Sequence, residues 1–214
     1  LAAPAYYAAE KKSSAASEEI DTTLSNGTVW DGFYTQQGKT AYQQRKYIAV
    51  EFRPYLMAEG EEKDEQLLSI MDVGAGVGST ALALLANSRV RSSLVAYTCT
   101  DCSQVGLDML QARVSDQGAL AGSGSSSSIR FNTQVWDIAA YRWKEEEEGT
   151  LFNRLTCIFT LSAIHPAAHV ESLRNMASAL EPGGYILFRD YAVHDMTMYV
   201  IYVSSSISSL YFHH

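Results

Sequence analysis

Residues 67–80, LLSIMDVGAGVGST, constrain the fold of this chain more than any other stretch. The apolar run from 67 to 73 is typical of a buried parallel strand. Three glycines on alternate positions follow, and then a leucine-rich segment for which Ser79 and Thr80 are N-cap candidates. A strand, a glycine turn and a helix form the first unit of a doubly wound sheet. The sequence therefore predicts an α/β fold with a mostly parallel, Rossmann-like sheet.

The spacing of the glycines separates two classes of nucleotide-like ligand. A dinucleotide fingerprint reads G-x-G-x-x-G or A, and the sequence fails at the last place, which is Ser79. Instead, Asp72 stands two residues before the first of Gly74, Gly76 and Gly78, which looks like the first motif of S-adenosylmethionine-dependent methyltransferases. A helix N-terminus suits the carboxylate of that cofactor, and an acid near the strand end suits its ammonium group. A glycine-rich turn in another α/β protein is the alternative.

Four further strands are expected, and each ends beside an unusual polar group. The strands are expected at residues 93–99, 129–135, 155–161 and 185–188. The groups that follow them are Asp101, Asp137, residues 162–165 and residues 189–191. Ligands of open α/β sheets bind outside the carboxyl ends of the strands, so we expect these groups to share a pocket with the glycines. Asp101 also stands at roughly the 20-residue spacing at which nucleotide-binding folds place an acid on the ribose. Loop solvation is the alternative for any single group.

Helices are expected before and between these strands. Residues 40–56 have helical spacing that Pro54 disturbs near its end. Ser103 is a cap candidate for the helix after the second strand. The apolar face of that helix is expected to consist of Leu107, Leu110 and Val114. The helix after the fourth strand is expected to bury Val170, Leu173, Ala177 and Leu180.

The chain divides into three expected parts. Residues 1–28 are rich in Ala, Ser and charge, and are expected to form a mobile arm. Residues 29–66 form an aromatic and helical cap, and 67–214 form the α/β domain with the glycine motif. Trp30, Phe33 and Tyr34 are an aromatic group for which a hydrophobic cap on the sheet is the simple interpretation.

Charge and cysteine content restrict partners and compartment. The 214 residues carry a formal charge of −8, whereas proteins that bind nucleic acid unaided are usually basic. An RNA substrate would therefore need a local basic patch or a partner protein. Three cysteines do not make a disulfide framework, which favours packing roles and a reducing compartment, the cytoplasm or alternatively mitochondria. No apolar run approaches the ~20 residues of a membrane span.

Several motifs together resemble the tRNA 3-methylcytidine methyltransferases, over about residues 30–195. They are Trp30-Asp31-x-Phe33-Tyr34, the glycine motif from Asp72 to Gly78, Thr100-Asp101-x-Ser103, LSAIHP at 161–166, and Pro182-Gly183 followed by LFRDY at 187–191. The resemblance implies a class I fold with S-adenosylmethionine as cofactor. It implies that the cofactor is bound by Asp72, Gly74, Gly76, Gly78, Asp101 (ribose), Asp137 (adenine), Leu161 and Ser162. It also implies that the substrate pocket and its chemistry involve Trp30, Tyr34, Arg45, Asp190 and Tyr191.

Two departures from the family stand out. Residues 41–47 are less aromatic and less basic than the matching helix start. Family members continue through another helix and a strand pair, whereas residues 204–214 read SSSISSLYFHH. Either pieces of the chain are absent from the numbered sequence, or the chain is shortened. A shortened form would lack the last helix and strand pair and leave a sheet edge unpaired unless a partner covers it.

The resemblance implies methyl transfer to N3 of a cytidine in a tRNA anticodon loop. Neutral cytosine has a lone pair on N3, so the reaction needs alignment rather than a general base. Trp30, Tyr34 and Tyr191 are expected to sandwich the base, and Asp190 to stabilise the cationic product. His165 is expected to fix its loop by a hydrogen bond, and no metal is expected at His165 and His169. Another RNA substrate, such as ribosomal RNA, and a silent subunit of an RNA–protein assembly are the alternatives.

Overall fold

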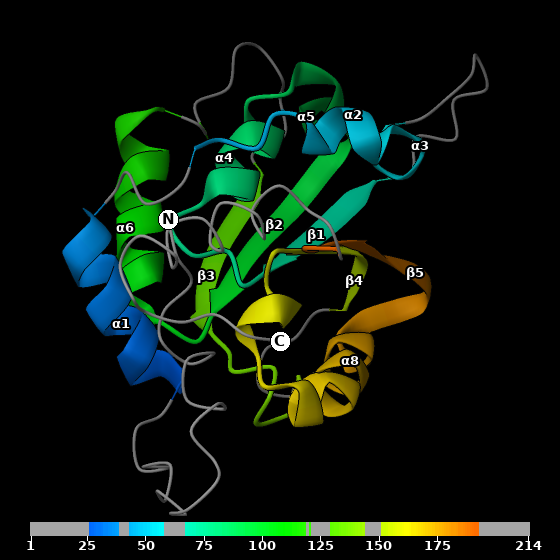
Figure 1. Ribbon diagram of the computed structural model, residues 1–214. Helices are drawn as coiled ribbons and strands as arrows, with labels where there is room; N and C mark the ends of the chain where they lie inside the picture. The colour runs from blue at the N-terminus through cyan, green and yellow to red at the C-terminus, as the bar shows by residue number, and fades with distance from the viewer. Residues whose placement is uncertain are drawn as a thin grey trace, which may run out of the picture.

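The computed structural model describes residues 26–38, 43–57, 67–118, 120, 129–143 and 151–192 (Figure 1). These residues form a five-stranded sheet of order β3-β2-β1-β4-β5 in which every neighbouring pair is parallel. The strands are β1 (Leu68–Val73), β2 (Leu94–Asp101), β3 (Arg130–Val135), β4 (Phe152–Ile158) and β5 (Leu180–Arg189). The predicted doubly wound parallel sheet is confirmed. Strand order reverses between β1 and β4, which is where such sheets bind ligands.

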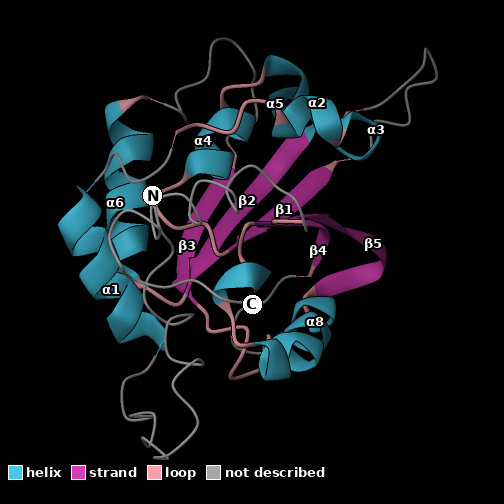
Figure 2. Cartoon of the chain, in the orientation of Figure 1, coloured by secondary structure: helices cyan, strands magenta, loops and turns pink. Residues whose placement is uncertain are grey.

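Helices cover both faces of the sheet, as Figure 2 shows. They are α1 (Asn26–Gln37), α2 (Ile48–Glu51), α3 (Arg53–Leu56), α4 (Ser79–Leu85), α5 (Ser88–Ser93), α6 (Gln104–Asp116) and α8 (His169–Ser178), with short 3-10 turns η3 (Leu161–Ala163) and η4 (Pro166–Ala168). None of the helices in the described ranges has the length and apolar character that a membrane crossing requires.

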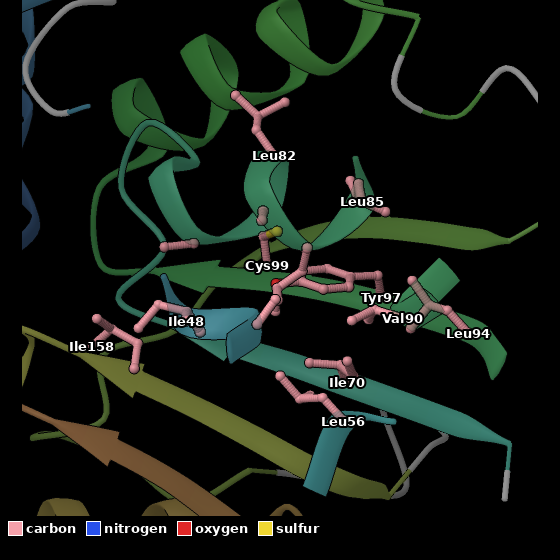
Figure 3. Packing of buried hydrophobic residues seen from close by; sticks show 14 of the residues in the cluster. Ile48, Leu56, Ile70, Leu82, Leu85, Val90, Leu94, Tyr97, Cys99 and Ile158 are labelled. Atoms are coloured by element: carbon pink, nitrogen blue, oxygen red, sulfur yellow. The ribbon is translucent and has the colours of Figure 1, made fainter. Parts of the chain in front are cut away.

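The hydrophobic core lies in two layers, one on each face of the sheet. Ile70 of β1 points into the layer under α2 to α6, where it meets Tyr97 and Leu56 (Figure 3). Met71 points to the opposite face and packs with Met176 of α8. Because β1 is buried on both faces, its sequence is an unbroken apolar run apart from Ser69 and Asp72, as a central parallel strand requires.

Several expected boundaries are wrong, each for a local reason. Ser79 and Thr80 do not cap α4, because Gly78 occupies the N-cap in a left-handed conformation. The expected helix at 40–56 is replaced by two short helices: residues 43–45 are irregular and Phe52 separates α2 from α3. The fourth strand ends three residues earlier than expected, because Phe159 has a φ of 56° and breaks the strand.

Helix α8 buries a different face from the expected one. Val170 and Leu173 are 57% and 44% exposed, and Ala177 is exposed as well, whereas Asn175 and Met176 are buried. Asn175 donates from Nδ2 to the Ile138 carbonyl at 2.8 Å, so a buried amide finds a partner there. The buried face is therefore mixed, with Met176 and Ala179 beside Ser172 and Asn175.

Other expectations on local structure are confirmed or lie outside the described ranges. Ser103 caps α6 by accepting from the Gly106 amide at 3.0 Å, and Leu107, Leu110 and Val114 are all buried. Helix α1 begins at Asn26, inside the expected arm, while residues 1–25 are not described. Residues 193–214, on which the expectation about the last helix and strand pair depends, are not described either.

Candidate functional site

The glycine loop after β1 is enclosed by side chains on two sides. Gly74 and Gly76 have φ angles of 66° and 52°, which L-residues rarely adopt. A Cβ on Gly74 would collide with Thr160, just past β4, and one on Gly76 would lie 2.5 Å from Tyr34 Oη. Gly78 has a different surrounding, because a Cβ there would meet Leu110 of α6 at 2.9 Å. Gly78 therefore allows close packing of α4 on α6.

Asp101, at the end of β2, holds the glycine loop through its carboxylate. Its Oδ2 accepts the Gly76 amide at 2.8 Å, and its Oδ1 accepts the Ser103 amide at 2.9 Å. Burial raises the pKa of Asp101 to about 6, against the lowering effect of these two amides. Each carboxylate oxygen has a second lone pair, so Asp101 can still accept hydroxyl groups of a ribose.

Asp72 lies beneath the loop and is almost completely buried. Its Oδ1 accepts the Thr156 hydroxyl at 2.6 Å, and Oδ2 has no hydrogen-bond partner within the described residues. Burial raises the pKa of Asp72 to about 6; Asp101 adds to the rise, while Thr156 and Arg45 oppose it. With so little exposed surface, Asp72 supports the loop from below and is not an open ligand group.

We expect an Asp72→Asn variant to be more stable than wild type at pH 8. An acid whose pKa is raised on folding stabilises the native state below its unfolded pKa, and that stabilisation is lost as the pH rises through the folded pKa. The rise from 3.8 to about 6 corresponds to ~3 kcal/mol lost above pH 6. Urea denaturation between pH 4 and 8 measures it, with exposed Asp108→Asn as control. An equal gap between variant and wild type at all pH values would contradict the expectation.

The polar groups at the strand ends act on one another electrostatically, as a shared pocket requires. After burial, Asp101 and then Asp137 raise the pKa of the Cys102 thiol, so these two acids lie near each other. Burial raises the pKa of Cys157 to about 12, with contributions from Asp190 and Asp72. Asp101 and Asp137 therefore both act on Cys102, and Asp190 and Asp72 both act on Cys157.

The cysteines themselves have packing roles, as expected. All three are free, Cys99 and Cys157 are buried, and burial raises the pKa of the Cys99 thiol well above its usual range. Thiols of this kind are weak nucleophiles and weak metal ligands.

Asp190 ties the loop after β4 to the end of β5. Its Oδ2 accepts the Ser162 amide at 2.9 Å and its Oδ1 accepts the Tyr191 amide at 2.8 Å. Leu161, beside Ser162, is buried in the core layer under α8. These contacts give Asp190 a positioning role in addition to the expected electrostatic one.

The two histidines of this loop hydrogen-bond to backbone atoms. The Nδ1 of His165 accepts the Ala167 amide at 3.2 Å, which confirms the expected loop-fixing contact. The Nε2 of His169 lies 3.0 Å from the Leu161 carbonyl and 2.9 Å from the Ile164 carbonyl. Within the described ranges, no cluster of three His, Cys, Asp or Glu side chains with metal-binding geometry occurs.

The residues expected to border the substrate lie in two groups. Arg45 donates to the Ile158 carbonyl at 3.0 Å and lies 5.0 Å above the ring of Phe159, which is 4.7 Å from Tyr191. Trp30 and Tyr34 instead pack with each other and with Phe33 on α1, with ring centroids 5.3 to 5.8 Å apart. No ring contact joins Tyr191 to the α1 group among the described residues, and Tyr191 packs beside Phe159. The expected stacking of a base between these rings stays a prediction.

The α1 group is a wall of the glycine loop and α6, where the sequence suggested a cap on the sheet. Tyr34 is only 4% exposed, and its ring also packs against Gly106. Asp31 Oδ1 accepts the Ser103 hydroxyl at 2.6 Å and the Val105 amide at 3.2 Å. Hydrogen bonds thus run from Asp31 through Ser103 and Asp101 to the glycine loop. Sequence reasoning gave Asp31 no role, and its place in the Trp-Asp-x-Phe-Tyr motif is the available signal.

We expect Asp31→Ala to loosen α1 from α6, because two buried donors lose their acceptor. The expected cost is ~1–2 kcal/mol, as for the loss of a helix cap. Trp30, next in sequence, reports the change as a shift of its fluorescence on steady-state emission. Asp31→Asn keeps an acceptor oxygen, so we expect it to restore the wild-type fluorescence and the wild-type melting temperature. An Asp31→Ala emission spectrum and melting temperature equal to those of wild type would rule out the anchoring role.

The site suits a cationic nucleoside such as S-adenosylmethionine. The pKa values of Asp72 and Asp101 are raised partly by neighbouring acids, and a sulfonium or ammonium charge would relieve that repulsion. Asp101 offers acceptors to ribose hydroxyls, and Asp137 follows the neighbouring strand β3. Asp137 Oδ1 accepts the Ala139 amide at 2.9 Å, which fixes its loop.

Comparison with known protein families agrees with this geometry. Residues 41–209 match a family described as a methyltransferase domain. Similar curated proteins include tRNA N(3)-methylcytidine methyltransferase trm140 of Schizosaccharomyces pombe, 30% identical over 78% of this chain and 50% of the relative. The tRNA N(3)-methylcytidine methyltransferase trm141 of the same species is 30% identical over 78% of this chain and 60% of the relative. The tRNA(Thr) (cytosine(32)-N(3))-methyltransferase of Saccharomyces cerevisiae is 27% identical over 84% of this chain, which covers 27% of that relative. The chain spans about half the length of the first two relatives.

Proposed function

Because the chain belongs to the methyltransferase domain family, we propose that it methylates N3 of a cytidine in a tRNA anticodon loop. S-adenosylmethionine is the methyl donor. The observation that carries the proposal is the Asp101 carboxylate at the end of β2, which accepts the Gly76 amide of the glycine loop, in a chain similar to tRNA N(3)-methylcytidine methyltransferases. Those relatives are tRNA methyltransferases, which supports tRNA as the substrate.

The proposed chemistry requires alignment and no general base. The bound cofactor supplies an electrophilic methyl group on a sulfonium. The lone pair of cytosine N3 would form the new C–N bond while the S–C electron pair would stay on sulfur, which leaves as a neutral thioether, and the base would become cationic. Holding both partners in line can supply ~7–11 kcal/mol in favourable cases. Anticodon-loop bases are unpaired, so turning one into a pocket costs less than flipping it from a duplex.

The residues divide this work between the two sides of the glycine loop. Asp101 and Asp137 orient the nucleoside end of the cofactor, and the amide-bound Asp190 carboxylate holds the loop of Ser162 in place. Tyr191 and Phe159 offer ring faces to the cytosine. Asp190 is bonded to the Tyr191 amide, so its carboxylate would stabilise the positive charge of a product base held at that ring.

Partner and compartment extend the same proposal. An adaptor or RNA-binding protein would add affinity for tRNA to a chain with a net charge of −8. We place the reaction in a reducing compartment, the cytoplasm or alternatively mitochondria, because the three cysteines are free. Another RNA, such as ribosomal RNA, and a silent structural subunit are the competing functions.

Two measurements test the proposal in order. Calorimetry with S-adenosylmethionine asks whether the chain binds the cofactor; no binding would support the silent subunit. Mass spectrometry of nucleosides from RNA incubated with protein and cofactor then identifies the product. We expect 3-methylcytidine from tRNA, whereas product from ribosomal RNA alone would support the other substrate. Heat-treated protein and cofactor-free reactions are the controls.

A further inference from the structure

Tyrosines and arginines line one side of β5, from its middle to the candidate site. The ring of Tyr185 lies 5.1 Å from that of Tyr55 on α3, and the Arg154 guanidinium lies 4.9 Å from the Tyr185 ring. Arg154 also donates from Nε to the Tyr55 carbonyl at 2.7 Å. Arg154 is buried, so it fixes two tyrosine rings that remain 42% (Tyr55) and 48% (Tyr185) exposed.

The same arrangement recurs at the far end of β5. Arg189 lies 5.1 Å from the ring of Tyr47, which is 42% exposed, and its guanidinium pairs with Glu51 at 2.5 Å. Arg189 and Tyr185 are four residues apart, so they project from the same face of the strand. Tyr47 directly precedes α2 and Tyr55 lies in α3, and Figure 1 shows these two helices next to each other.

The row reaches the pocket through Tyr191. Tyr191 is half exposed and lies two residues past Arg189. Its ring packs at a tilt against Phe159, and the Arg45 guanidinium lies over the Phe159 ring. Six residues of extended chain from Tyr185 to Tyr191 span ~20 Å. We call this surface the tyrosine strip; its exposed rings are Tyr47, Tyr55, Tyr185 and Tyr191. Its ring-contacting cations are Arg45 and Arg189, and we include the exposed Lys46 and Arg53, which lie one and two residues before Tyr47 and Tyr55 in sequence.

The charge of the described residues differs from that of the whole chain. Acidic runs such as 59–65 and 145–148 account for much of the −8 and lie outside the described ranges. Within those ranges, acids and cations are nearly balanced, and Lys46 and Arg53 on the strip are exposed. Glu51 partly neutralises Arg189. The strip is thus the kind of local basic and aromatic surface that an acidic chain needs to bind RNA.

We propose that the tyrosine strip binds the single-stranded RNA that flanks the target nucleotide. Bases stack on aromatic rings with ~1–3 kcal/mol each, and arginine and lysine neutralise phosphates. The strip would lead the unpaired loop of the RNA to the pocket, where Tyr191 is its last ring. This inference rests on the proposed function, because it takes RNA as the substrate.

Binding of a synthetic anticodon stem-loop RNA, with a cytidine in its loop, tests the strip by fluorescence anisotropy. Lys46→Gln with Arg53→Gln removes two exposed cations from the strip. Arg130→Gln with Arg174→Gln removes two exposed cations from β3 and α8, so it is matched in charge. We expect RNA affinity to fall about tenfold in the first double variant, with a salt slope smaller by about two, and to change little in the control.

Stacking is tested separately with Tyr47→Ala and Tyr185→Ala. Each is expected to weaken RNA binding at least about fivefold, with a nearly unchanged salt slope. Calorimetry with S-adenosylmethionine on every variant is expected to give wild-type affinity, which shows that the fold is intact.

The outcomes separate the strip from the proposed function. Equal RNA affinity in strip and control variants, or no RNA binding by the wild-type chain, would overturn the strip. So would a change of oligomeric state in the strip variants with RNA affinity retained, because the strip would then be a protein interface. Strip-dependent RNA binding without 3-methylcytidine would instead support the strip and contradict the proposed reaction.

Discussion

An Asp101→Ala variant is expected to bind S-adenosylmethionine at least about 100-fold more weakly than wild type. Hydrogen bonds to a charged group contribute ~1.5–3 kcal/mol each, and the ribose would lose its carboxylate acceptor. The variant also leaves the Gly76 and Ser103 amides without their acceptor, so the glycine loop loses its support. Isothermal titration calorimetry at pH 8, where Asp101 is ionised, measures the loss.

The controls for this prediction separate binding from folding. Asp101→Asn keeps one acceptor oxygen and is expected to lie between wild type and Asp101→Ala. Asp108→Ala removes an exposed acid from the adjacent helix α6 and is expected to bind normally. Near-ultraviolet circular dichroism establishes that each variant is folded. Cofactor affinity within threefold of wild type in a folded Asp101→Ala protein would remove Asp101 from the site.

Wild-type cofactor affinity is also expected to rise with pH through about 6. Binding to a cation or to ribose hydroxyls favours the ionised carboxylate, and burial raises the pKa of Asp101 to about 6 in the free protein. The stability of the free protein is expected to change in the opposite direction, because the raised pKa of Asp101 makes the free energy of unfolding fall as the pH rises to about 6. The two pH dependences therefore distinguish a binding effect from a folding effect.

The sheet and the glycine loop were predictable because their signals are local. A mostly apolar run predicts a central strand such as β1. Ser103, followed by three apolar residues at helical spacing, predicts α6. The ends of parallel strands share one edge, so Asp101 and Asp137 were expected together without any knowledge of contacts.

Contacts between distant residues could not be predicted in this way. Asp31 and Ser103 are 72 positions apart, and no periodicity relates them. Helix α8 is a second example. Asn175 can be buried because its amide donates to the Ile138 carbonyl, a partner that only the tertiary structure brings near. Phe159 is a third case, because a bulky residue with positive φ contradicts the local preference of its sequence.

The conformation of Gly74 leads to the largest expected loss of stability from a single methyl group. In Gly74→Ala, the positive φ of 66° costs ~1–2 kcal/mol, and the collision with Thr160 adds ~1–3 kcal/mol. Thr160 cannot turn away freely, because its hydroxyl donates to the Val73 carbonyl at 3.1 Å. We expect a loss of ~2–5 kcal/mol in urea denaturation, and cofactor binding lost with it.

A second glycine and a second variant show which cause operates. Gly32 lies in α1 with no atom within 4 Å of an added Cβ, so Gly32→Ala is expected to stabilise the protein by ~0.5–1 kcal/mol. Introducing Gly74→Ala into a Thr160→Ala background relieves the collision but leaves φ unchanged, so it isolates the cost of the backbone. If Gly74→Ala costs no more than Gly32→Ala, neither the positive φ of Gly74 nor its contact with Thr160 constrains the loop at the end of β1.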